Sequence, residues 1–165
     1  MLCVVMLCHA FYFCLELDSF LITLSTVVSL VQAITNLVKD QNNDHVKRVA
    51  AFSKDAIKAS AETLIDEDDP SKGYLQIRVG FHSGPVIADV IGSRLPKFGV
   101  FGDAVNTASR MESNSETMRI HCSEVSAKLL MTQDPTINVT SRGKIKIKGK
   151  GEMHTYWVGD DLPLH

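Results

Sequence analysis

Apolar and polar residues follow a helical period between Asp44 and Ile65. Apolar side chains recur there every three or four positions, and cations and acids occupy the positions between them. This spacing places the apolar residues on one face of a helix, so the segment predicts an amphipathic helix. The acidic stretch Asp66–Gly73 follows and contains Pro70, a composition typical of an exposed loop.

The remaining patterns alternate between strand and helix. Leu75–Phe81 alternates apolar and polar or glycine positions with a period of two, which predicts a strand. Ser123 is a favourable N-cap for a short helix ending at Met131, and two further strands are predicted at Asn138–Lys148 and Met153–Val158. Helices laid over a mostly antiparallel sheet, an α+β fold, are the most economical arrangement of these elements.

A further helix is predicted in the segment FGDAVNTASRMES (Phe101–Ser113), with Asp103 as its N-cap. Asn106 and Arg110 then lie one turn apart on the same face, opposite the apolar positions of the segment. A carboxamide beside a guanidinium is suited to holding a sugar oxygen and a phosphate, because arginine presents a rigid fork of donors. The alternative is a pair of solvated surface side chains at the same spacing.

Cations occupy every even position of Arg142–Lys150, and glycine or isoleucine occupies every odd position. In a strand this alternation places five cations on one face. Like charges side by side repel, so we expect a polyanion such as a triphosphate, or acids of a partner element, near them. A solvated edge strand protected by lysines is the alternative. Gly149 and Gly151 would let the following turn approach a ligand closely.

The first 38 residues differ in composition from the rest of the chain. Glu16 and Asp18 are the charged residues there, and Ser19–Val38 is an uncharged run of 20 residues. Such a run is long enough to cross a bilayer as a helix, and the cations after it favour a cytoplasmic C-terminal side. It also contains many hydroxyl and amide groups, so a buried helix or a pair of strands fits it as well. We expect an apolar segment at 1–38, either a membrane helix or sequence outside the domain, followed by a domain at 39–160.

Composition narrows the function classes. A chain of 165 residues with 45% hydrophobic residues is expected to form one core, and a net charge of -2 argues against a general nucleic-acid binder. The four cysteines have no CxxC spacing of the kind that binds metals, so we expect buried thiols in a reducing compartment. The first residues lack a basic stretch, which argues against a cleaved signal peptide.

Four blocks of sequence together resemble the class III nucleotide cyclase catalytic domain, and the guanylate cyclase branch is the most similar. In chain order they are IRVGFHSGPVIADVIG (Ile77–Gly92), PKFGVFGDAVNTASRMES (Pro96–Ser113), RIHCS (Arg119–Ser123) and RGKIKIKGKGEMHTYWV (Arg142–Val158). The likeness continues more loosely through the predicted helix at Asp44–Ile65 and fades before about Ala33. The resemblance implies a ferredoxin-like βαββαβ core, here incomplete at its N-terminus, that forms a head-to-tail homodimer or a heterodimer with another cyclase chain.

The resemblance also implies a reaction. A phosphorus-oxygen lyase of this family converts a nucleoside triphosphate, here with GTP favoured, to the 3′,5′-cyclic nucleotide and pyrophosphate in intracellular signalling. The ribose 3′-hydroxyl attacks the α-phosphorus, and positioned cations stabilise the charge on the phosphoryl oxygens. By motif position, Asn106 would orient the ribose, Arg110 would stabilise the reacting phosphoryl group and Lys148 would hold the terminal phosphates. Gly99 occupies a purine-reading position that is usually Cys in guanylate cyclases and Asp in adenylate cyclases.

The metal positions depart from the family pattern. The family holds Mg²⁺ or Mn²⁺ with two aspartates, one in an N-terminal strand similar to FSDIVGFT and one in a hairpin similar to GDAYM, and this sequence contains neither motif. Aligned on Ala33–Asn36, Ser29 replaces the second aspartate, and a hydroxyl is a poor substitute for a carboxylate that bridges two Mg²⁺ ions. Nothing around Asp18 matches the family. The purine-reading glutamate of the hairpin is also absent, and Asp89 replaces a usual glycine. We therefore expect no metal-binding residue to be in place.

Three interpretations remain open. In the first, the intact protein is a cyclase whose N-terminal part is lost from, or misassigned in, this sequence. In the second, the chain is a complementary half that gives Asn106, Arg110 and Lys148 to a partner chain supplying the metal aspartates, because class III active sites lie across the dimer interface. In the third, it is a membrane-tethered module that senses a nucleotide or dimerises. The cyclase-like part would be cytoplasmic in each case.

Overall fold

The computed structural model describes residues 2–8, 21–25, 30–35, 43–92 and 97–159. In chain order the elements are β1 (Leu2–Cys8), β2 (Leu21–Ser25), β3 (Leu30–Thr35), α1 (His45–Glu62), a 3-10 turn (Pro70–Lys72), β4 (Arg78–Gly84), β5 (Ile87–Ile91), β6 (Lys97–Phe101), α2 (Asp103–Ser113), β7 (Ile120–Ser123), α3 (Glu124–Gln133), β8 (Val139–Ile147) and β9 (Gly151–Val158).

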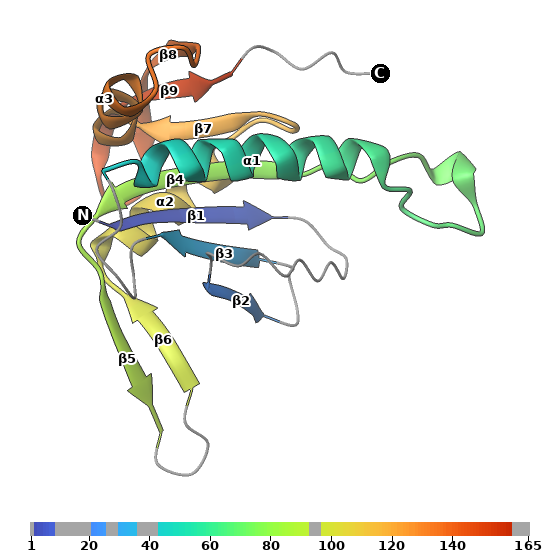
Figure 1. The fold of residues 1–165 in the computed structure, drawn as a ribbon, viewed down its shortest axis with the longest axis horizontal. Coiled ribbons are helices and arrows are strands. Elements are labelled where there is room, and N and C mark those ends of the chain that lie inside the picture. The colour runs from blue at the N-terminus through green and yellow to red at the C-terminus, as the bar shows by residue number, and fades with distance from the viewer. Residues whose placement is uncertain (1, 9–20, 26–29, 36–42, 93–96, 160–165) are drawn as a thin grey trace.

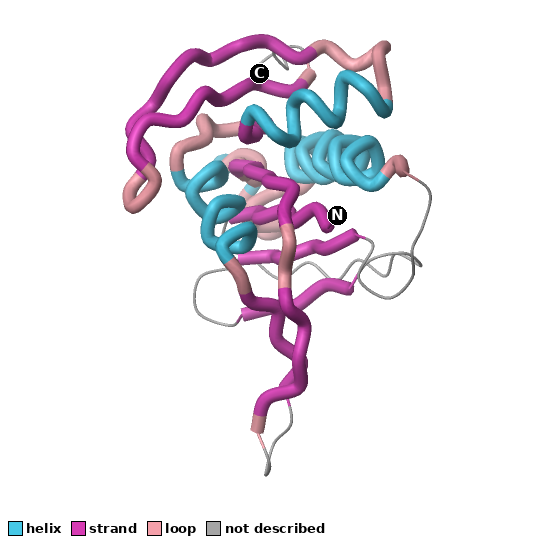
Figure 2. Tube along the Cα trace, turned by 90° about the vertical axis from the view of Figure 1, so that its left-hand side faces the viewer, coloured by secondary structure: helices cyan, strands magenta, loops and turns pink. Residues whose placement is uncertain are grey.

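A seven-stranded sheet in the order β2-β3-β1-β4-β7-β9-β8 forms the body of the protein. Strands β4 and β7 pair in parallel, and the other neighbouring strands of this sheet pair antiparallel. Strands β5 and β6 form a separate two-stranded arm that projects away from the body (Figure 1). In the view of Figure 2, α1 and α3 lie on one side of the sheet and α2 lies on the other. The structure confirms the α+β fold.

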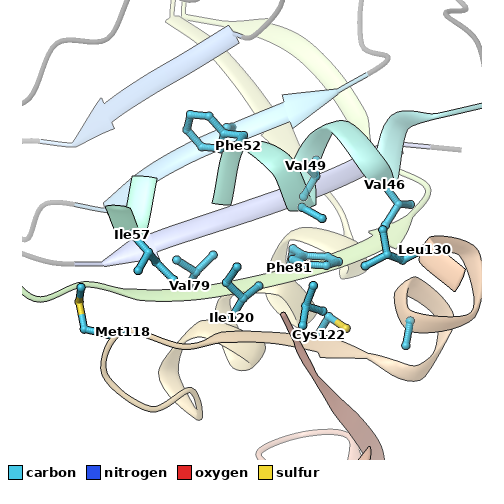
Figure 3. Close-up of a cluster of buried hydrophobic side chains, with 14 residues drawn as sticks. Val46, Val49, Phe52, Ile57, Val79, Phe81, Met118, Ile120, Cys122 and Leu130 are labelled. Carbon is cyan, nitrogen blue, oxygen red and sulfur yellow. The ribbon is translucent and has the colours of Figure 1, made fainter. Parts of the chain in front are cut away.

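The core lies between the sheet and the α1–α3 side. Helix α1 forms because its apolar residues recur at helical spacing, and this stripe, including Val46, Val49 and Ile57, is buried. It contacts Val79 and Phe81 of β4, which are also fully buried (Figure 3). The helix predicted from the apolar period is confirmed, with ends three residues or fewer from the predicted ones.

The strand predicted at Leu75–Phe81 begins later, at Arg78. The reason is local pairing: the amide of Leu75 donates to the carbonyl of Thr63 over 2.8 Å, and Tyr74 forms a bridge with Leu64. Tyr74 and Leu75 therefore pair with the chain that leaves α1. The loop between Ile65 and Tyr74, residues 66–73, is mostly exposed, as its composition predicted.

Helix α2 lies against the opposite face of β4 at very short range. A Cβ added to Gly80 would be 1.9 Å from the amide nitrogen of Glu112, so only glycine allows this approach. At the C-terminal end of β4, a Cβ on Gly84 would be 2.9 Å from the Cβ of Ala104. The two glycines thus set the position of α2 at both ends of the contact.

The uncharged run Ser19–Val38 forms two strands in its described part, β2 and β3, which pair antiparallel. The strand-pair alternative is therefore the one that the structure supports. Among the described residues, no helix combines the length and apolar character that a membrane span requires.

Candidate functional site

The N-terminus of α2 differs by one residue from the prediction. The N-cap is Gly102, with φ of 139°, and Asp103 is the first residue of the helix. Glycine fits the cap because this φ is unfavourable for side chains and because a Cβ would lie 3.2 Å from the carbonyl oxygen of Pro85. Asp103 stays in the first turn, where a negative charge is favourable at the positive end of the helix dipole, and its carboxylate accepts hydrogen bonds from the Lys150 ammonium.

Asn106 and Arg110 lie one turn apart on the outer face of α2, as the sequence predicted. Asn106 is exposed and Arg110 is half-buried, whereas Ala108 and Met111 on the other side are fully buried. Across the described ranges, neither the Asn106 carboxamide nor the Arg110 guanidinium has a hydrogen-bond or ion-pair partner. Both polar groups are therefore available to a ligand.

The prediction of five cations on one face of a single strand is wrong. The register of β8 against β9 shifts between Ser141 and Gly143, a β-bulge that changes which face the following residues take. The Arg142 guanidinium stacks over Trp157, 4.4 Å from the ring centroid. Lys144 pairs with His154 instead. His154 and Trp157 point to opposite faces of β9, because they are three positions apart and successive side chains of a strand alternate between faces. Arg142 is thus structural, and Lys144 and Lys146 lie on the other face.

The last two cations of this segment lie in the turn that joins β8 to β9. The strand ends at Ile147, whose carbonyl accepts a hydrogen bond from the Lys150 amide over 3.0 Å. Lys148 is exposed in this turn. Because Lys150 also binds Asp103, the turn that carries Lys148 lies against the first turn of α2, the helix that carries Asn106 and Arg110. The structure therefore brings three of the predicted site residues to one region.

Gly99, the fourth predicted site residue, lies on the arm, in the strand that precedes α2 in the chain. It is the central residue of β6 and pairs with Asp89 of β5 on the projecting arm. A Cβ at this position would be 2.5 Å from the ring of Phe101, a side chain that can move. Asp89 is exposed, and its carboxylate accepts a hydrogen bond from the Val90 amide over 2.7 Å.

Sequence reasoning missed His82, which lies beside the Asp103–Lys150 pair. Its Nδ1 lies 2.7 Å from Oγ of Ser123, the residue whose side chain caps α3. Burial lowers the pKa of His82, and the neighbouring Asp103 carboxylate and Lys150 ammonium act on it in opposite directions. The signal that could have identified His82 in the sequence is its position near the end of a strand, immediately before Ser83 and Gly84, which lead into the arm.

His121 of β7 is a second histidine that the sequence did not single out. Its Nδ1 lies 2.7 Å from the carbonyl oxygen of Met111, to which it donates, and Nε2 lies 3.4 Å from the Arg142 guanidinium. Burial lowers its pKa to about 4. The neutral ring matches both contacts, because one nitrogen donates to a carbonyl and the other accepts from arginine. His121 therefore connects α2 to β8 and supports the helix from beneath.

The described residues do not fit a divalent metal site. No three or more His, Cys, Asp or Glu side chains come together in the described part of the chain in a way that could hold a metal ion. A strand, β1, lies between β3 and β4 in the sheet, and its sequence LCVVMLC has no acidic residue. The sequences of β2 and β3 have none either. Ser29 and Asp18 lie outside the described residues.

Comparison with known proteins decides the family. The model of the adenylate and guanylate cyclase catalytic domain matches residues 17–160. The chain belongs to this family. It is 45% identical over 121 residues to the receptor-type guanylate cyclase gcy-6 of Caenorhabditis elegans, covering 70% of this chain and 10% of that protein. It is 41% identical over 120 residues to the human guanylate cyclase soluble subunit beta-2, covering 72% of this chain and 18% of that protein.

A further relative covers nearly the whole chain. The atrial natriuretic peptide receptor 2 of Anguilla japonica is 34% identical over 158 residues, which is 94% of this chain and 15% of that receptor. The part matched by this chain therefore spans between 10% and 18% of the length of these three relatives. The relatives include both receptor-type and soluble guanylate cyclases.

Solved structures confirm the class III cyclase fold. The guanylate cyclase domain of RhGC from Catenaria anguillulae, solved in complex with GTP, superposes with a TM-score of 0.77 at 24% identity and covers 95% of both chains. The adenylyl cyclase CyaB from P. aeruginosa gives a TM-score of 0.67 at 19% identity, over 98% of this chain and 95% of that one. At these identities the likeness establishes the fold.

Proposed function

We propose that this chain is the nucleotide-positioning half of a guanylate cyclase site. It binds a nucleoside triphosphate, with GTP favoured, and contributes to its conversion to the 3′,5′-cyclic nucleotide and pyrophosphate. The observation that carries the proposal is the contact of Lys150 with Asp103, which sets the Lys148 turn against the helix of Asn106 and Arg110. The two side chains on that helix have no other partner among the described residues.

Each of the three side chains has a role that its chemistry supports. The Asn106 carboxamide hydrogen-bonds and orients the ribose, so that the 3′-hydroxyl points at the α-phosphorus. The Arg110 guanidinium binds the α-phosphoryl oxygens, where negative charge accumulates as the bond to the 3′-oxygen forms. The Lys148 ammonium neutralises the terminal phosphates, which leave as pyrophosphate. None of these roles requires a carboxylate from this chain.

The acidic half of the site is proposed to come from a partner chain. The family resemblance implies Mg²⁺ or Mn²⁺ held by two aspartates, and the donor set of the described residues does not match such ions. We therefore propose a dimer with another cyclase chain, in which that partner contributes the carboxylates. The reaction would take place in the cytoplasm, where nucleoside triphosphates are found.

GTP is favoured because two of the relatives named above, gcy-6 and the human soluble subunit beta-2, are guanylate cyclases. The chain's own purine-reading position gives no support for either base, because Gly99 has no side chain with which to bind one. We propose that discrimination between GTP and ATP depends on groups other than Gly99.

Calorimetric titration of the purified chain with GTP tests the proposal at its first step. We expect saturable binding that weakens as salt rises, because exposed charges are screened. Asn106→Ala and Arg110→Ala should each weaken binding at least threefold. Ser113→Ala, which alters an exposed polar residue of the same helix, is the matched control and should leave it unchanged. No saturable binding, or equal losses in all three variants, would overturn the proposal.

A further inference from the structure

The turn between β8 and β9 holds its shape poorly by itself. Lys150 lies between Gly149 and Gly151, whose φ angles are 79° and 75°, and a Cβ at either glycine would meet nothing within 4 Å. Glycine has access to many backbone conformations, so ordering such a turn costs more conformational entropy than ordering an average one. The position of Lys148, two residues before Lys150, therefore depends on what holds this turn in place.

One side-chain contact ties the turn to α2. The Lys150 ammonium binds both carboxylate oxygens of Asp103. The Asp103 end is itself firmly placed, because the close approach of Gly84 and Ala104 fixes the start of the helix on β4. His82 and Ser123 lie next to this contact and connect it to the N-cap of α3. A flexible turn is thus attached to a rigid junction.

We propose that the Asp103–Lys150 ion pair is a positioning contact that holds the Lys148 turn over the first turn of α2. In this role neither Asp103 nor Lys150 contacts the nucleotide. Their effect is on the distance between the Lys148 ammonium and the Asn106–Arg110 face, and hence on whether one triphosphate can contact all three. The contact itself follows from the geometry alone. Its effect on nucleotide binding rests on the proposed function.

The strength of the Asp103–Lys150 ion pair determines how strongly it can favour one position of the β8–β9 turn. The Asp103 side chain is 74% exposed and that of Lys150 is 27% exposed, so the pair belongs to the weaker, solvent-accessible class. Such a pair changes an equilibrium by about fivefold at most. That is too little to determine whether the domain folds, and enough to bias a glycine-rich turn between two positions.

Limited proteolysis measures the contact without any nucleotide. Trypsin cleaves after Lys148 when the turn leaves its folded position, so the initial rate at this bond reports how well the turn is held. Asp103→Asn should raise the rate about threefold to fivefold. Asp89→Asn, the same chemical change at an exposed residue of the arm, should not change it. Equal rates for the parent protein and Asp103→Asn would overturn the proposal.

Calorimetry with GTP and GMP then separates positioning from direct phosphate binding. Asp103→Asn and Lys150→Met should each weaken GTP binding about threefold to fivefold, leave GMP binding unchanged and show no further loss when combined. Lys150→Arg should retain parent affinity, because it keeps the ion pair. If Asp103→Asn leaves GTP affinity unchanged or raises it while Lys150→Met lowers it, Lys150 is a phosphate ligand and the proposal is overturned. If the parent chain binds no GTP, the proposed function fails and the trypsin result alone decides the contact.

Discussion

His121 shows how a single buried side chain makes stability depend on pH. The ring is fully buried, and its two nitrogens are used by the Met111 carbonyl and the Arg142 guanidinium. A second proton would have to displace the arginine contact and would place a charge beside Arg142 and Arg119. Burial is the main reason that its pKa falls to about 4.

The sign of the pH effect follows from that pKa. An unfolded histidine binds a proton near pH 6.5, and folded His121 does so only near pH 4. Between these values the unfolded state binds more protons, so acid favours unfolding, and the stability contribution is complete only above pH 6.5. The parent should lose about 2 kcal/mol more than His121→Gln between pH 7 and pH 5. Urea denaturation at the two values measures this, and equal losses would contradict it.

Lys148 is the residue whose proposed role is most easily separated from a structural one. It is exposed in the β8–β9 turn, and so is Lys144 on the strand before it. Lys148→Ala should weaken GTP binding about tenfold, the value of one charge-assisted hydrogen bond at a partly exposed site, and leave GMP binding unchanged. Lys144→Ala should change neither affinity. Competition with a fluorescent nucleotide measures both, and an equal loss for GTP and GMP would show that Lys148 does not bind the terminal phosphates.

At the scale of elements, the contact between α2 and β4 determines where the proposed site lies. The helix lies so close to the strand that Gly80 almost touches the backbone of Met111 and Glu112. Glu112 is buried there and forms an ion pair with Arg78, with 3.1 Å between Oε1 and the guanidinium. Any displacement of α2 would move Asn106 and Arg110 with it.

Gly80→Ala should therefore be severe. The new Cβ would clash with backbone atoms at 1.9 Å and 2.3 Å, which cannot move aside as a flexible side chain can, so we expect a loss of about 3 kcal/mol or more. Gly73→Ala is the matched control: there is open space at Gly73, whose φ is 78°, so it should cost only about 1–2 kcal/mol of backbone strain. Denaturant midpoints measure both. A loss at Gly80 no larger than that at Gly73 would show that α2 does not approach β4 this closely.

Helices and strands were predictable from the sequence where their period was long and regular. The period of α1 and the Ser123 cap of α3 are local signals, and both are confirmed. The bulge at Ser141–Gly143 was not predictable, because it depends on the partner strand β9 and reverses the face that Arg142 occupies. The start of β4 was displaced for the same reason: pairing of Tyr74 with Leu64 is a tertiary contact. In the site, the spacing of Asn106 and Arg110 was visible, whereas the contact of Lys150 with Asp103 and the place of His82 beside it required the fold.

At the scale of the whole molecule, the described part of the chain carries the groups proposed to bind sugar and phosphate but not the carboxylates that would bind the metal ions. The groups suited to sugar and phosphate lie together at the start of α2 and in the β8–β9 turn. The strands on the β1 side of the sheet have no acidic residue in their sequences. The purified chain alone should therefore show no cyclic nucleotide production above background with Mg²⁺ or Mn²⁺. Metal-dependent turnover of GTP or ATP by a homogeneous sample, measured by chromatography of the product, would contradict this.

Complementation tests the central claim most directly. This chain is mixed with a cyclase chain that retains its metal-binding aspartates and carries alanine at its own equivalents of Asn106 and Arg110, after sedimentation has established that the two chains associate. The account predicts that GTP cyclisation appears only in the mixture. Arg110→Ala should lower it at least about 100-fold without affecting association, because a preorganised donor aimed at the phosphate acts mainly in the transition state. Ser113→Ala should leave it intact. A mixture that associates and stays inactive, or one whose activity survives Arg110→Ala, would contradict the account.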